Sequence, residues 1–84
     1  MKIPKTVKIG SDWWIIKITN FDEEPGKFGE CDFEAKTIRL NKNQTRSEMG
    51  YTLAHELLHA CVPDLGEEPV MRYEAVIRSV RLYG

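Results

Sequence analysis

The spacing of apolar residues changes at Asn41, and this change limits the fold of the chain more than any other feature. Before Asn41, apolar side chains recur at every second residue, as in strands; after it, they recur at every third or fourth residue, as in helices. Strands followed by helices are typical of an α+β domain. Because 84 residues can bury one core but not two, we predict a single domain over residues 1–84.

Four segments before Asn41 have the alternation and the β-branched or aromatic residues of strands. They are Thr6–Ile9, Trp13–Ile18, Phe28–Phe33 and Thr37–Leu40. The last two are joined by too few residues for a parallel crossover, so they should form an antiparallel hairpin. We therefore predict a small antiparallel sheet over about residues 6–40. Trp13 and Trp14 are interpreted as packing residues of the core and the sheet surface.

Two helices should follow the sheet. The first covers about residues 46–61, because Thr45 and Glu48 have the spacing of a capping box and Pro63 follows the end. The second covers about residues 67–82, because Gly66 precedes two acidic residues and a proline, which suit a first helical turn. Its buried stripe is expected to comprise Val70, Tyr73, Ile77 and Val80.

Composition argues against several classes of partner. The formal net charge is −1 and no basic stripe is present, which argues against nucleic acid. The chain shows no apolar run near the ~20 residues that span a bilayer and no signal-peptide pattern, so we expect a cytoplasmic protein without a membrane partner. Cys31 and Cys61 lack the spacing of a redox or metal-binding pair and are expected to be buried free thiols.

The motif that carries chemistry is His55-Glu56-Leu57-Leu58-His59, in the first predicted helix. Two histidines four residues apart project from one face of a helix and can together bind one tetrahedral zinc ion. Glu56 is offset by about 100° around the helix axis, so it flanks the metal and can act as a general base. These are the roles of the H-E-x-x-H motif.

The first predicted helix keeps its apolar side chains away from this motif. Leu53, Leu57 and Ala60 lie about 140° to 200° around the axis from His55, whereas His59 lies only about 40° from it. The apolar stripe also includes Met49, Ala54 and Cys61. One face can therefore pack on a core while the opposite face binds one zinc ion per chain.

The segment Thr52–Ala60, with the strands before it, resembles the small zincin-type, gluzincin-like zinc metallopeptidases of phages and bacteria. The stretch Gly29-Glu30-Cys31-Asp32, with Thr37–Leu40, resembles the hairpin before their active-site helix. The resemblance implies that His55 and His59 bind zinc and that Glu56 is the catalytic base. It also implies that an edge strand aligns a protein or peptide substrate. The substrate-binding residues would be Gly29, Glu30 and Cys31, within the segment 29–33.

A third zinc ligand has to come from outside the motif. A metzincin continuation would need a glycine and a histidine where this chain has Val62 and Leu65, and the chain has no third histidine. A carboxylate remains, as in gluzincin-like enzymes. The candidates are Asp64, Glu67, Glu68 and Glu74. Glu67 is favoured because it lies on the inner edge of the second helix, near its start, with Glu68 and Glu74 as alternatives.

The pattern predicts metal-assisted hydrolysis of a peptide bond, with Glu56 accepting and returning the proton. The donor to the transition-state anion is left open among Tyr51, Tyr73 and Arg72. The alternative is a non-catalytic domain in which zinc stabilises a small core, with Cys31 or Cys61 as a fourth ligand. A metal-free binding module would require the motif to be accidental. The sequence does not indicate an oligomeric state.

Overall fold

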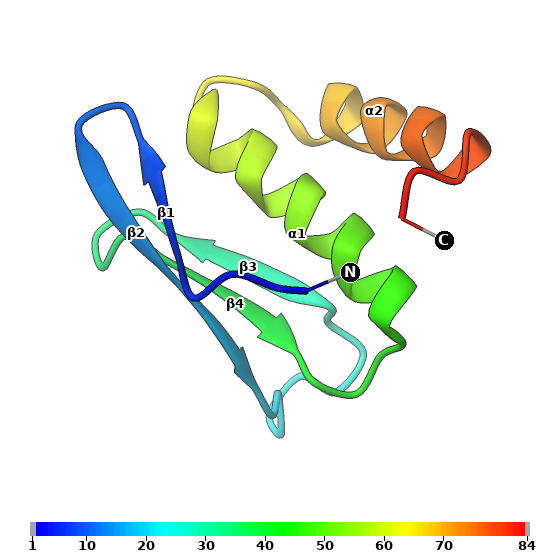
Figure 1. Cartoon of the computed structure of the whole chain (residues 1–84), viewed down its shortest axis with the longest axis horizontal. Coiled ribbons are helices and arrows are strands. Elements are labelled where there is room, and N and C mark those ends of the chain that lie inside the picture. The colour runs from blue at the N-terminus through cyan, green and yellow to red at the C-terminus, as the bar shows by residue number, and fades with distance from the viewer. Residues whose placement is uncertain (1, 84) are drawn as a thin grey trace.

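Residues 2–83, which the computed structural model describes, form four strands followed by two helices (Figure 1). The strands are β1 (Thr6–Ile9), β2 (Asp12–Thr19), β3 (Gly29–Asp32) and β4 (Thr37–Asn41); the helices are α1 (Arg46–Cys61) and α2 (Glu67–Ser79). This order confirms the α+β class and the sequence of elements that the apolar spacing predicts.

The sheet is mixed, with the strand order β1-β2-β4-β3. β1 pairs with β2, and β3 with β4, in antiparallel fashion, as expected for the β3–β4 hairpin. β2 and β4 run parallel, with Ile16 opposite Ile38. The sheet therefore differs from a wholly antiparallel one in this central pair. The loop after β2 carries the chain to the outer edge, and the hairpin then returns β4 to the middle, alongside β2.

α1 packs across one face of the sheet and builds the core with it. The buried residues shared by these elements are Trp14, Ile16, Ile38, Leu40, Met49, Leu53 and Ala60. Trp14 is 5% exposed, whereas Trp13, on the neighbouring strand position, is 64% exposed. Successive strand residues point to opposite faces. The two tryptophans accordingly divide between the core and the open surface of the sheet.

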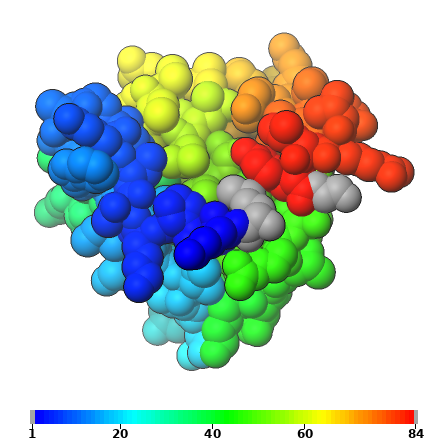
Figure 2. Space-filling view, in the orientation of Figure 1, coloured from blue at the N-terminus to red at the C-terminus, as the bar shows by residue number. Residues whose placement is uncertain are grey.

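α2 packs on α1, on the side away from the sheet (Figures 1 and 2). The orange atoms of α2 and the blue atoms of β1 and β2 lie on opposite sides of the yellow-green atoms of α1 (Figure 2). Val70 and Ile77 are buried in this contact, but Tyr73 and Val80 of the predicted stripe are exposed. Because α2 packs mainly against α1, it buries only a narrow strip of its surface. Tyr73 and Val80 lie outside that strip and remain exposed.

α2 ends at Ser79, short of the predicted end at about residue 82. The Leu82 N–H donates to the Ile77 carbonyl (3.1 Å) and the Arg81 N–H donates to the Arg78 carbonyl (3.0 Å), which is the Schellman arrangement of a helix end. Arg81 takes the left-handed conformation, with φ 54°. Glycine is the usual residue there, so an arginine gave no signal of this stop.

The two cysteines are free, and they differ in burial. Cys31 on β3 is half-buried against the core. Cys61 is exposed, contrary to expectation, because it lies in the last turn of α1 beside an open groove lined by Leu58 and Tyr73. Within residues 2–83, no helix is both long enough and apolar enough to cross a bilayer.

Candidate metal centre

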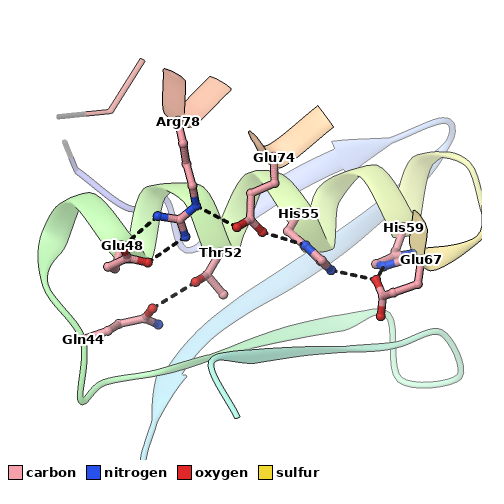
Figure 3. Close-up of polar contacts among 8 residues, drawn as sticks. All are labelled: Gln44, Glu48, Thr52, His55, His59, Glu67, Glu74 and Arg78. Carbon is pink, nitrogen blue, oxygen red and sulfur yellow. Dashed lines mark hydrogen bonds and ion pairs between the residues drawn. The ribbon is translucent and has the colours of Figure 1, made fainter. Parts of the chain in front are cut away.

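The two histidines of α1 converge on the first residue of α2 (Figure 3). The ring centroids of His55 and His59 are 5.0 Å apart. Glu67 Oε1 lies 3.0 Å from His55 Nε2 and 2.7 Å from His59 Nε2. The three potential ligand atoms lie within 4.8 Å of one another. α1 thus supplies two donors one turn apart, and the reversal of the chain after α1 brings the third.

The other candidate carboxylates have different surroundings. Glu68 faces solvent and accepts a hydrogen bond from Arg72 at 2.9 Å. Glu74 reaches His55, but on the opposite ring nitrogen, with Glu74 Oε1 2.8 Å from Nδ1. Asp64 is exposed in the turn between the helices. Glu67 is therefore the carboxylate that the fold brings to both Nε2 atoms.

The contacts of His55 test whether these residues fit a metal ion. Both ring nitrogens face carboxylate oxygens, which can only accept hydrogen bonds, and a neutral imidazole carries one N–H. A hydrogen on Nδ1 satisfies Glu74 and leaves the Nε2 lone pair directed at Glu67. A cation between Nε2 and Glu67 resolves this conflict. Imidazole nitrogen and carboxylate oxygen are both metal donors, so the cluster fits a metal ion.

Glu56 lies beside the histidines and is only 8% exposed. Burial raises the pKa of its carboxyl above the ordinary value of 4.5, and the nearby histidines oppose that shift only in part. A carboxyl whose pKa is raised toward neutrality is a stronger proton acceptor. The position and the environment of Glu56 both suit proton transfer.

A groove runs between α1 and the free edge of β3. It consists of two hollows of about 310 and 290 Å³ that share Lys27, Gly29, His55, Glu56 and Glu67. One hollow extends toward Phe28 and Arg78, and the other toward Cys31 and Phe33. The groove therefore passes Glu56 on both sides, along the strand that the sequence indicated for substrate binding.

A family model matches most of this architecture. The model of the IrrE N-terminal-like domain matches residues 15–75, from β2 into α2. The chain belongs to this family. The IrrE N-terminal-like domain family is one of zincin-like metallopeptidases, which confirms the resemblance drawn from the sequence. No curated protein and no solved structure matches the chain.

The segment matched by the IrrE N-terminal-like domain contains His55, Glu56, His59 and Glu67. Among residues 2–83, the side chains grouped closely enough to hold a metal ion are His55, His59 and Glu67, and neither cysteine belongs to this cluster. Burial, followed by the charge of Glu56, raises the pKa of Cys31 to about 11. Because neither cysteine lies in the cluster, a thiolate ligand has no support in the geometry.

In this member of the IrrE N-terminal-like domain family, Gly29 lets β3 approach α1 closely. A Cβ atom at this position would lie 2.6 Å from Thr52 Cγ2, 3.2 Å from the Arg39 carbonyl oxygen and 3.3 Å from Glu56 Cγ. The first of these distances is a steric clash. A residue with a side chain would therefore require Thr52 or β3 itself to shift.

Two amides position the groove, and neither could be singled out from the sequence pattern. Asn41, which is 1% exposed, donates from Nδ2 to the Lys27 carbonyl at 2.9 Å. Gln44 donates to the Phe28 carbonyl at 3.2 Å and accepts from the Thr52 hydroxyl at 2.9 Å. The Asn41 bond ties the residues before β3 to the end of β4, and the bonds of Gln44 tie them to α1. Isolated amides are common, so only the fold shows their role.

Glu48 has a different role from the one its spacing predicts. Its backbone N–H donates to the Thr45 hydroxyl at 3.1 Å, as in a capping box. Its carboxylate, however, does not complete the box: both oxygens accept from Arg78, 30 residues away, at 2.7 Å. A bidentate pair between two ions is stronger than a single bond from a carboxylate to a backbone N–H, which explains the choice. Arg78 holds the pKa of the Glu48 carboxyl below its ordinary value.

The three donors considered for the transition state lie elsewhere. Tyr51 is buried and packs against Tyr83, Tyr73 lines the groove between the helices, and Arg72 faces solvent with Glu68. None of the three lines the groove beside β3. Lys27, which no sequence pattern marks, lines both of its hollows.

Proposed function

We propose that this chain is a zinc-dependent metallopeptidase that hydrolyses peptide bonds in a protein substrate. The observation that carries the proposal is the convergence of His55, His59 and Glu67 next to a buried Glu56, in a groove bounded by a free strand edge. Two histidines and one glutamate are a zinc set that leaves room for water or substrate. We expect one zinc ion per chain.

The groove residues account for the other needs of the reaction. When bound, zinc lowers the pKa of water and polarises the substrate carbonyl. Glu56 accepts the proton of the attacking water and returns it to the leaving amine. β3 offers backbone groups to an extended substrate, which adds to the sheet edge as a further strand. Lys27 lines both hollows beside Glu56 and is our candidate hydrogen-bond donor to the developing oxyanion.

The alternative is a domain in which zinc serves stability alone. One observation favours it: α2 packs on α1 but not across the sheet, so a metal shared by the two helices would fasten it. Both functions use the same ligands. They differ in Glu56, because a stabilising site does not need a base.

The decisive experiment compares wild-type protein with Glu56→Gln, both loaded with zinc. Metal analysis should find one zinc ion per chain in each. Cleavage of a proteome-derived peptide library, followed by mass spectrometry, should be at least about 100-fold slower in the variant, which lacks the base. Glu34→Gln, an exposed surface change, should cleave as the wild type does. Zinc-loaded wild type that cleaves no more than Glu56→Gln would leave the stabilising function as the conclusion.

A further inference from the structure

Arg78 is neither a candidate metal ligand nor the candidate base. Its guanidinium connects the two helices (Figure 3). Nε donates to Glu74 Oε2 at 2.7 Å, and the two terminal nitrogens donate to the two oxygens of Glu48, each at 2.7 Å. The guanidinium also lies over the Tyr51 ring, 4.6 Å from its centroid. Its orientation is thus fixed by two carboxylates and one ring.

The other oxygen of Glu74 continues this chain of contacts to the metal centre. Glu74 Oε1 is 2.8 Å from His55 Nδ1, and His55 Nε2 is directed at Glu67. Since a carboxylate only accepts, Nδ1 carries the hydrogen and Nε2 is left as the donor atom for a metal. A partner on the second ring nitrogen fixes both the tautomer and the orientation of a ligand histidine.

Another arginine on α2 offers an internal comparison. Arg72 pairs with Glu68, four residues before it, at 2.9 Å, just as Arg78 pairs with Glu74. Both side chains of the Arg72–Glu68 pair are exposed to solvent. Arg78 differs because Glu48 of α1 provides a second anchor. Exposed ion pairs within a helix contribute little to stability. A guanidinium that is hydrogen-bonded to two carboxylates, one of them through two parallel bonds, has a defined orientation.

We infer that Arg78 is a positioning residue of the metal centre: anchored on Glu48, it holds Glu74 against His55 Nδ1 and so directs Nε2 toward the metal position. This inference rests on the metal site of the proposed function. It extends that site along α2, to a residue beyond the segment matched by the family model.

The test measures zinc affinity by competition with a chromogenic chelator. We expect Arg78→Met to weaken zinc binding about 10- to 100-fold, and Glu74→Gln to do so at least as much. Arg72→Met, the matched control, removes the same charge from the same helix and should remain within about twofold of wild type. Because Arg78 acts through Glu74, the double variant Arg78→Met/Glu74→Gln should bind zinc no more weakly than Glu74→Gln alone.

Two further measurements separate positioning from loss of structure. Thermal unfolding of the metal-free proteins shows whether each variant folds, and the absorption spectrum of the cobalt-substituted proteins should change for Arg78→Met but not for Arg72→Met. If Arg78→Met does not fold, Glu48→Gln takes its place, with a smaller expected loss of affinity. Affinity equal to that of Arg72→Met, or fully additive losses in the double variant, would overturn the inference. Wild-type protein that binds no zinc would instead overturn the proposed function.

Discussion

At Gly29 the two walls of the groove lie too close together to admit a side chain without a shift. It pairs with Leu40 in the sheet, while Thr52 and Glu56 of α1 occupy the space where its Cβ would be. The absence of a side chain therefore sets the separation between the strand edge and the helix. Backbone flexibility is not the reason for this glycine, because its φ lies outside the left-handed region.

Gly29→Ala should lower the free energy of unfolding by about 1–3 kcal/mol, as added atoms do in a well-packed interior. Thr52→Ser removes the methyl group nearest to the new Cβ and keeps the hydroxyl that donates to Gln44. The double variant Gly29→Ala/Thr52→Ser should therefore recover much of the loss. Urea unfolding of the four proteins of the cycle measures the coupling.

Gly26→Ala is the matched control, since a Cβ there would meet nothing within 4 Å. Its unfolding free energy should lie close to that of the wild type. Losses from Gly29→Ala and Thr52→Ser that simply add would contradict the steric explanation.

The residues of the candidate site that lie close together in the chain could be predicted from the sequence. His55, Glu56 and His59 are defined by their spacing on one helix. The phase of the next helix allowed both Glu67 and Glu74, and only the short connection between the helices favoured Glu67. The partners Glu74 and Arg78 could not be assigned in the same way. Their roles depend on which oxygen meets which nitrogen across two helices, and sequence spacing does not determine that.

The contact between α1 and α2 relies on charge as well as apolar packing. From the carboxyl end of α1 toward its start, the cross-helix pairs are His59 with Glu67, His55 with Glu74 and Glu48 with Arg78. This order means that the helices run in opposite directions. Val70 and Ile77 are the buried residues of α2, and these three polar pairs add cross-helix contacts beside them.

The Glu48–Arg78 pair predicts a particular dependence of stability on pH. The pKa of Glu48 is below 4.5 in the folded protein because Arg78 hydrogen-bonds to its carboxylate. The stability from this pair is therefore complete above the unfolded pKa of about 4.5 and is lost as the pH falls through the lower folded pKa. Urea unfolding of metal-free protein should show a shallower decline below pH 4.5 for Glu48→Gln than for wild type.

Glu34→Gln serves as the comparison for the pH series, because Glu34 is an exposed carboxyl in the β3–β4 turn. Its curve should run parallel to that of wild type. If the unfolding free energy of Glu48→Gln followed the same dependence on pH as that of the wild type, the ionised Glu48 carboxylate would not contribute to stability.

Among the elements, the strands and the first helix followed from apolar spacing, whereas their arrangement did not. Alternation identifies a strand without naming its neighbour, so the parallel pairing of β2 with β4 could not be predicted. The end of α2 depends on a left-handed Arg81 rather than on a glycine or proline. The exposure of Tyr73 and Val80 likewise depends on how many neighbours α2 has.

In the whole molecule, α1 is the central layer, with the sheet on one side and α2 on the other. A metal held by His55, His59 and Glu67 would join the outer layer to the central one. Metal binding should therefore affect α2 more than the sheet. A ligand that binds only the folded state at 100 times its Kd stabilises that state by about 2.7 kcal/mol.

Hydrogen exchange measured by mass spectrometry should report this coupling. Adding zinc to metal-free protein should slow exchange in α2 more than in β2 and β4, and a chelator should reverse the change. The protection should fade at mildly acidic pH, as protons compete for the imidazole nitrogens. His59→Ala should show no zinc-dependent change. Equal protection of all elements on zinc addition would contradict a link specific to α2.

The length of β3 has a consequence for the choice of substrate. Its four residues extend over about 13 Å, so a chain lying against it can be held in register over only about four residues. So short a template can distinguish few side chains. For the proposed peptidase, we therefore expect the accessibility of an extended segment in the target, rather than a long consensus sequence, to determine the site of cleavage.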